Sequence, residues 1–225
     1  MTNFVIGAWA VFRKDISLEL KTKEILSSML VFSLLVVVVF SFIFEPGTME
    51  QSRVAGGIYW MALIFAGLLG LGKSMQSEIT GGNLEALLLS PIGRNAIFYG
   101  KVLSIFTFLL FMQLIMLPLF AVLYEVNLVS HPYMAVVIIG TTYGFALLGT
   151  LFSLIAARSS TREILLPLLL LPVLIPVILA AIQSTNGILF NDPAEAYIKW
   201  IRLIAVFDVI FTAVISLVFE AAVEE

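Results

Sequence analysis

One short stretch of the chain has the residues of a nucleotide-binding loop. Residues 67–74, GLLGLGKS, fit the P-loop formula G-x-x-x-x-G-K-[ST], in which backbone N–H groups and a lysine hold phosphate oxygens. Asp208 closes an apolar run at residues 203–208, and an aspartate in that position holds Mg²⁺ in such sites. These residues raise the hypothesis of ATP hydrolysis, which depends on the elements that carry them.

The composition is that of a membrane protein. Of the 225 residues, 61% are hydrophobic and 12% are charged, with a mean hydropathy of +1.10. A soluble domain is about half apolar and about a quarter charged. The net charge is −3 and no basic block is present, so we expect no nucleic-acid partner. Because the chain has no cysteine, disulfides, thiolate zinc sites and a cysteine nucleophile are excluded.

Six stretches are apolar enough to cross a bilayer as helices, since about 20 residues span its hydrocarbon core. They are expected at about residues 25–44, 54–72, 98–124, 133–156, 163–182 and 200–220. The candidate kinks are Pro118 in the third span and Pro167, Pro172 and Pro176 in the fifth. A proline kink without function is about as common in membrane helices as one with a function, so both interpretations stay open. The fold class is therefore an all-α integral membrane protein, with one transmembrane domain over residues 1–225.

The basic residues predict the orientation. With the N-terminus inside, nine lysines and arginines lie on inner segments and three on outer ones, so both termini are expected in the cytoplasm. The last outer connection is expected at about residues 183–199. Residues 7–24 mix apolar clusters with charges and are expected to form a helix in the inner membrane interface; a disordered basic tail is the alternative.

This context argues against the P-loop hypothesis. A P-loop joins a buried strand to a helix in an α/β domain, whereas residues 67–74 end an apolar span. Lys73 is expected at the cytoplasmic end of that span, where a lysine can snorkel and meet the negative end of the helix dipole. Asp208 is expected nearer the outer face, so the two could not meet at a nucleotide.

Small residues in two spans predict close helix packing instead. The two small faces consist of Ala62, Ala66 and Gly70 in the second span and of Gly140 and Gly144 in the fourth. Such faces let helix backbones approach in lipid. We expect them to pack against a second copy of the chain or against other membrane subunits.

The cytoplasmic segment after the second span predicts a docking element. Asn83 can cap a short helix at residues 84–89 that Pro91 ends, with an apolar face too short to span the membrane. Such a face needs a groove in a partner, although a re-entrant or surface-lying segment is the alternative. The candidate docking residues are Glu78, Gly82, Leu84, Glu85, Leu87, Leu88, Pro91 and Arg94.

The same segment resembles the signature loop of ABC-2-type transporter permeases. The pattern E-x-x-x-G-N-L-E-A-L-L-L-S-P starts at Glu78, and a G-K pair follows at Gly100 and Lys101. Over most of residues 10–220 the chain resembles, more narrowly, the CcmB family of haem exporter permeases of cytochrome c maturation. Three stretches agree: R-V-A-x-G-I-x-W at 53–60, G-x-x-x-G-F at 140–145 and the proline-rich run at 165–178. Asp208 and the acidic tail match no pattern of that family.

The resemblance implies a non-catalytic subunit in the bacterial inner membrane, with no catalytic or metal-binding residue of its own. Its loop would dock on a separate ATP-binding cassette subunit, whose ATP hydrolysis would drive haem export or release of a haem-loaded chaperone. Other membrane subunits of cytochrome c maturation are implied as partners, and haem is implied as cargo rather than as a cofactor of this chain alone. An ABC-2-type exporter for a drug, a lipid or a polysaccharide is the alternative.

Three ionisable residues remain. Asp208 in the sixth span should face the bundle or water because a charge in lipid is costly; a functional role and an interfacial position are both open. His131, the only histidine, is a candidate axial haem ligand on an outer loop, where a solvated side chain is the more common outcome. Lys101 begins the third span and is expected to snorkel rather than to bind another group.

Overall fold

The computed structural model is a helical bundle, and it describes residues 2–44, 47–80, 89–90, 92–126, 131–157, 159 and 161–221. The helices are α1 (Thr2–Thr22), α2 (Glu24–Ser41), α3 (Met49–Thr80), α5 (Arg94–Tyr124), α6 (Pro132–Ala156), α7 (Arg162–Leu189) and α8 (Ala194–Ala221). Six of them are long and apolar enough to cross a membrane, namely α2, α3, α5, α6, α7 and α8. The predicted all-α class and the six spans are confirmed, and no strand occurs in the described ranges.

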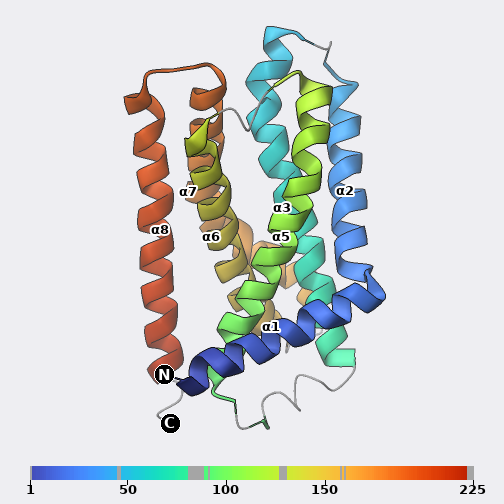
Figure 1. The fold of residues 1–225 in the computed structure, drawn as a ribbon, viewed down its shortest axis with the longest axis vertical. Coiled ribbons are helices and arrows are strands. Elements are labelled where there is room, and N and C mark those ends of the chain that lie inside the picture. The colour runs from blue at the N-terminus through green and yellow to red at the C-terminus, as the bar shows by residue number, and fades with distance from the viewer. Residues whose placement is uncertain are drawn as a thin grey trace.

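The bundle has two halves and a helix across one end (Figure 1). Helices α2, α3 and α5 stand on one side and α6, α7 and α8 on the other, joined where α5 packs on α6 and α3 packs on α7. Helix α1 runs obliquely across the end of the bundle and packs on α5. The start of α1 and the end of α8 lie at this same end, as an even number of spans requires.

A sharp corner separates α1 from α2. Lys23 has a φ of 55°, in the left-handed region, and it breaks what would otherwise be one continuous helix. The buried carboxylate of Glu19 accepts hydrogen bonds from the backbone N–H groups of Ile25 (3.3 Å) and Leu26 (2.8 Å). These donors have no partner within α2, so Glu19 caps that helix and holds the corner. The helix predicted at residues 7–24 is present as α1; its place in the membrane interface stays a prediction.

Residues 67–74 lie wholly within α3, which continues to Thr80. The N–H groups of a helix interior are used in its own hydrogen bonds, so this stretch cannot cradle phosphate oxygens as a P-loop does. The argument against a P-loop at residues 67–74 therefore holds on backbone geometry as well as on sequence context.

The outer connection predicted at about residues 183–199 is much shorter in the structure. Helix α7 continues to Leu189 and α8 begins at Ala194. The prediction is wrong because the polar residues at 183–186 belong to α7. Thr185 is buried, and its hydroxyl accepts a hydrogen bond from Trp60 Nε1 at 2.9 Å, while Asn186 Nδ2 donates to the carbonyl oxygen of Arg53. With partners inside the bundle, these side chains are compatible with a helix.

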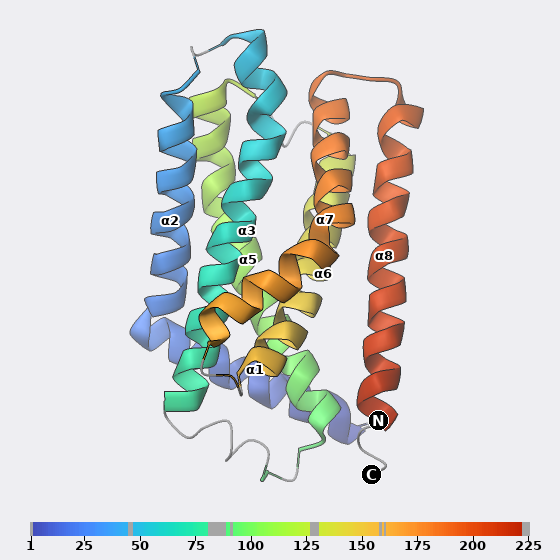
Figure 2. The ribbon, with the colours of Figure 1, turned by 180° about the vertical axis from the view of Figure 1, so that it is seen from behind.

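Helix α7 is bent, and its first part crosses the bundle at an angle to the rest, at the front of the view in Figure 2. Pro167, Pro172 and Pro176 lie in the helix interior. A proline removes a backbone donor and clashes with the preceding turn, so a bend is the usual result. Pro118 lies inside α5.

The two small-residue faces pack within the chain. A Cβ atom at Gly70 would lie 2.5 Å from the sulfur of Met29 on α2. Cβ atoms at Gly140 and Gly144 would lie 2.9 Å from Ile204 and 2.5 Å from Asp208 on α8. Ala62 and Ala66, on the first face, are buried. Because neighbouring helices of the same chain cover these faces, they give no indication of a second copy or of another subunit.

Hydrogen bonds between side chains link the halves of the bundle. Tyr59 on α3 donates to Gln113 Oε1 on α5 at 2.9 Å, and Gln113 Nε2 donates to Thr142 Oγ1 on α6 at 2.7 Å. All three residues are buried. In lipid a polar side chain without a partner is costly, so this chain of bonds holds three helices in register.

Gln113→Leu should therefore loosen the bundle. The variant loses two hydrogen bonds and leaves Tyr59 and Thr142 without them, which should lower the free energy of unfolding by about 1–2 kcal/mol. Reversible unfolding in mixed detergent micelles measures this quantity. Gln183→Leu is the matched control, because Gln183 is exposed on α7. Equal effects of the two substitutions would contradict a structural role for the buried amide.

Candidate functional site

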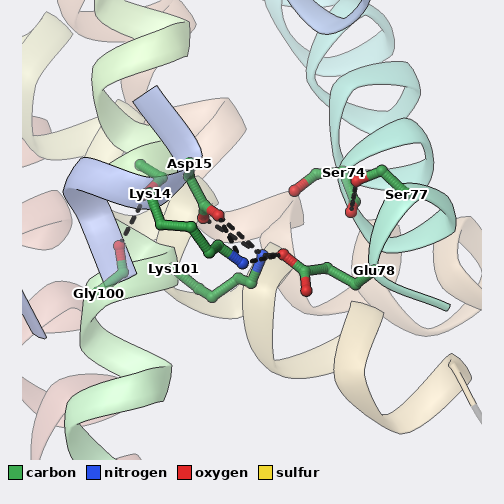
Figure 3. Close-up of polar contacts among 8 residues, drawn as sticks. Lys14, Asp15, Ser74, Ser77, Glu78, Gly100 and Lys101 are labelled. Carbon is green, nitrogen blue, oxygen red and sulfur yellow. Dashed lines mark hydrogen bonds and ion pairs between the residues drawn. The ribbon is translucent and has the colours of Figure 1, made fainter. Parts of the chain in front are cut away.

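Four charged side chains meet where α1 crosses the bundle (Figure 3). Lys14 and Asp15 come from α1, Glu78 from the last turns of α3 and Lys101 from the start of α5. We call these four residues the charged cluster. Asp15, Glu78 and Lys101 are only 6%, 2% and 3% exposed. Ions so deeply buried are tolerated only when each faces an opposite charge.

The two ammonium groups and the two carboxylates alternate. Lys101 Nζ lies 2.5 Å from Glu78 Oε1 and 3.2 Å from Asp15 Oδ2. Lys14 Nζ lies 2.5 Å from the same Glu78 oxygen and 3.1 Å from Asp15 Oδ1. Two positive and two negative charges balance, so the charged cluster ties three helices together and has no net charge.

A glycine allows this geometry. A Cβ atom at Gly100 would lie 2.7 Å from the carbonyl oxygen of Ala8 and 2.7 Å from Val11 Cβ, so the backbones of α1 and α5 touch there. Close approach of two backbones requires a residue without a side chain. Lys101 follows directly, and Asp15 lies one helical turn after Val11. The contact at Gly100 therefore brings the ammonium group and the carboxylate within reach of each other.

The charged cluster has a partly exposed side at Lys14 and a buried side at Glu78. Partial burial by itself lowers the pKa of Lys14, but the carboxylates of Asp15 and Glu78 outweigh it and hold that pKa above its ordinary value of 10.5. On the other side, Glu78 Oε2 is buried and receives no hydrogen bond from any residue that the structure describes. A cavity of about 200 Å³, with Ser74, Ser77 and Glu19 in its wall, borders Glu78. It gives room for water beside this oxygen.

Comparison with known proteins decides the family. A family model described as "CcmB protein" matches residues 6–225, nearly the whole chain. The chain belongs to the CcmB protein family. Heme exporter protein B of Pseudomonas aeruginosa is 26% identical over 176 residues, which cover 78% of this chain and 79% of that protein. Its namesake in Rhodobacter capsulatus is 27% identical over 170 residues, covering 76% and 78%. Heme exporter protein B of Escherichia coli K12 is 28% identical over 96 residues, or 43% of this chain and 44% of that protein.

In this CcmB family member the predicted docking residues fall into two groups. Six of them lie outside the described residues: Gly82, Leu84, Glu85, Leu87, Leu88 and Pro91. Arg94 is the exposed first residue of α5. Glu78 is part of the charged cluster, and its side chain faces α1 and α5 rather than a partner. Docking by the loop itself stays a prediction.

The expectation that Lys101 snorkels is wrong. Helix α1 covers its position and supplies Asp15, so the ammonium group stays inside. Sequence reasoning also missed Lys14 and Asp15. A signal was present: the buried positions of α1 include Gly7, Val11, Asp15 and Glu19, at a spacing of four residues. Two carboxylates in register with an apolar helix face indicate buried partners of positive charge.

The two other candidate residues lie away from the charged cluster. His131 begins α6 as its N-cap, with Nδ1 accepting a hydrogen bond from the Tyr133 N–H at 3.4 Å. Asp208 is half-buried on α8 and faces Gly144, and its Oδ1 has no hydrogen bond from a described residue. Within the described ranges, no three or more His, Cys, Asp and Glu side chains are grouped to hold a metal. Haem ligation by His131 and a role for Asp208 stay predictions.

Lys101→Met tests whether the charged cluster holds the fold of this CcmB family member. The variant leaves Asp15 and Glu78 buried with only Lys14, and loss of one partner of a buried ion pair costs about 3–5 kcal/mol of unfolding free energy. Denaturation in mixed micelles measures it. Lys21→Met is the matched control, because Lys21 is exposed on α1.

A double variant separates a charge effect from a packing effect. Adding Glu78→Gln to Lys101→Met removes the orphaned carboxylate, so the double variant should be less destabilised than the sum of the two single variants. Additive losses would show that the ion pair itself does not couple α3 to α5.

Proposed function

We propose that this chain is the membrane subunit of an ATP-driven haem-export complex, and that it receives mechanical work at the segment between α3 and α5. Membership in the CcmB family and the name Heme exporter protein B of its relatives support the haem-export role. The observation that carries the coupling role is the ion pair between Glu78 and Lys101. These residues flank the predicted docking segment, one before it and one after it.

The charged cluster makes the base of this segment rigid. A partner that pulled on residues 84–89 would load α3 and α5 together, because Glu78 and Lys101 lock their ends. Lys14 and Asp15 connect α1 to these two helices, and Glu19 at the corner connects α1 to α2. One half of the bundle would therefore move as a unit against α6, α7 and α8. Such a relative movement would drive haem export or release the haem-loaded chaperone.

Charge and surface chemistry support the proposed orientation. The excess of lysine and arginine on one side supports an orientation with both termini and the charged cluster in the cytoplasm, and the proposed membrane is the bacterial inner membrane. Helix α1 exposes the apolar side chains of Val5, Ile6, Trp9 and Leu20, which are 58–68% exposed. A helix with an apolar face at the end of a membrane bundle fits the headgroup region, so α1 is proposed to lie in the inner interface.

ATP hydrolysis is assigned to a separate ATP-binding cassette subunit, as the resemblance to ABC-2-type permeases implies. Residues 67–74 of this chain are helical and form no phosphate-binding loop. Haem is the proposed cargo of the complex, and other membrane subunits of cytochrome c maturation are its proposed further members. The chain itself is proposed to have no catalytic residue.

A charge in the apolar face of the docking segment should prevent assembly. Leu87→Glu or Leu88→Glu should abolish co-purification with the ATP-binding subunit, since a buried unpaired carboxylate in an interface costs several kcal/mol, roughly a thousandfold in affinity. Leu87→Met, which keeps the apolar face, is the control and should retain the partner. Undiminished binding by the Glu variants would refute the docking model.

Coupling can be tested apart from docking with Asp15→Asn. The substitution removes the ion pair of α1 with Lys101 and keeps the pairs of Glu78 with Lys14 and Lys101, so the partner should still bind and hydrolyse ATP. Haem-chaperone release per ATP should fall by at least about fivefold, the low end of ordinary coupling energies. Glu24→Gln, which neutralises an exposed carboxylate at the start of α2, is the control. Normal output from Asp15→Asn would show that the ion pair between Asp15 and Lys101 does not transmit the work.

A further inference from the structure

A cavity of about 350 Å³ lies between α2, α3, α6 and α7, away from the charged cluster. Its volume is within the range of small-ligand sites. The walls are mainly apolar and include Phe32, Phe65, Leu69 and Leu166. Phe65 and Leu69 are 39% and 41% exposed, so an apolar surface is open to an occupant.

The wall of this cavity includes two cations. Lys73 of α3 and Arg162 at the start of α7 both border it, together with Glu163. Two positive charges against one carboxylate give the lining of the cavity a net positive charge. Among the residues that the structure describes, neither Lys73 nor Arg162 has an ion-pair partner. Lys73 also borders the polar cavity beside Glu78, whereas Arg162 does not. A substitution of Arg162 therefore tests the present cavity without changing the wall of the other one.

The fold keeps this space open in two ways. The first part of α7 runs at an angle to the rest of the helix, and Pro167 in that part borders the cavity (Figure 2). On the opposite wall, a Cβ atom at Gly72 would meet no atom within 4 Å. The side of α3 that carries Gly72 and Lys73 is therefore not filled by packing. The GLLGLGKS stretch supplies the wall of a cavity instead of a phosphate-binding loop.

We propose that this cavity binds one anionic phospholipid, with its phosphate on Lys73 and Arg162 and an acyl chain along Phe65, Leu69 and Leu166. The charge pattern matches this occupant, because two cations and a set of apolar residues line the same cavity. Their depth also matches: Lys73 follows the apolar part of α3 and Arg162 begins α7, so both lie at the end of a span, where headgroups are found. This site is independent of the proposed haem-export role and of any protein partner.

Lipid binding to the purified full-length chain tests the proposal. Native mass spectrometry with phosphatidylglycerol, and with phosphatidylcholine of the same chains, measures the fraction of protein that keeps one lipid. Wild type should retain phosphatidylglycerol at least about fivefold better, since each basic residue contributes about 1 kcal/mol toward an anionic lipid. Arg162→Gln should remove most of this preference.

Gly72→Leu fills the cavity and should reduce binding of phosphatidylglycerol about tenfold. Its matched control is Gly57→Leu in the same helix, where an added Cβ atom also meets nothing within 4 Å. Circular dichroism checks that both variants are folded; if Gly72→Leu is not, Arg162→Gln decides. Retention of the lipid by folded Gly72→Leu overturns the site. Equal retention of the two lipids by wild type, or displacement by inorganic phosphate alone without an effect of Gly72→Leu, overturns the assignment to a phospholipid.

Discussion

The buried ammonium group of Lys101 is the constraint around which one half of this protein is built. It lies between Glu78 and Asp15, and none of the three could stay inside a membrane protein without the others. To satisfy it, α1 must cross the bundle at this level, and Gly100 must leave room for its backbone. The corner at Lys23 and the cap by Glu19 then set where α2 enters the membrane. A single electrostatic requirement thus positions four helices.

The remaining interior is held by another kind of contact. Hydrogen bonds through Gln113 and Thr185 connect helices across the two halves of the bundle, and glycine faces bring α6 against α8. These contacts are short and directional, so the halves have a defined resting arrangement. The charged cluster lies on one side only and is continuous with the predicted docking segment. This asymmetry is what makes a coupling role physically reasonable, because work applied at one end reaches one half first.

Most of the fold followed from the sequence, whereas only part of the site did. Long apolar runs predicted six spans because a membrane helix must satisfy its own backbone, and the structure confirms them. The predictions for the outer end of α7 and for the side chain of Lys101 are wrong for the same reason. Polar residues such as Thr185 look like loop or surface residues until their partners on distant helices are known. Trp60 lies 125 residues from Thr185 and Asp15 lies 86 from Lys101, so no local pattern could connect them.

The stretch GLLGLGKS shows which features follow from the sequence alone and which depend on the tertiary structure. Sequence alone determined that this stretch is a membrane helix, since its leucines belong in hydrocarbon and no α/β domain surrounds it. It also determined the family, through patterns spread along the chain. Only the tertiary structure decided which side chains of this helix pack, which are ion-paired and which face open space. Gly70 meets Met29, Glu78 meets Lys101 and Gly72 meets nothing within 4 Å. The reason is that hydropathy depends on each residue by itself, whereas packing and charge pairing depend on neighbours that only the folded chain brings together.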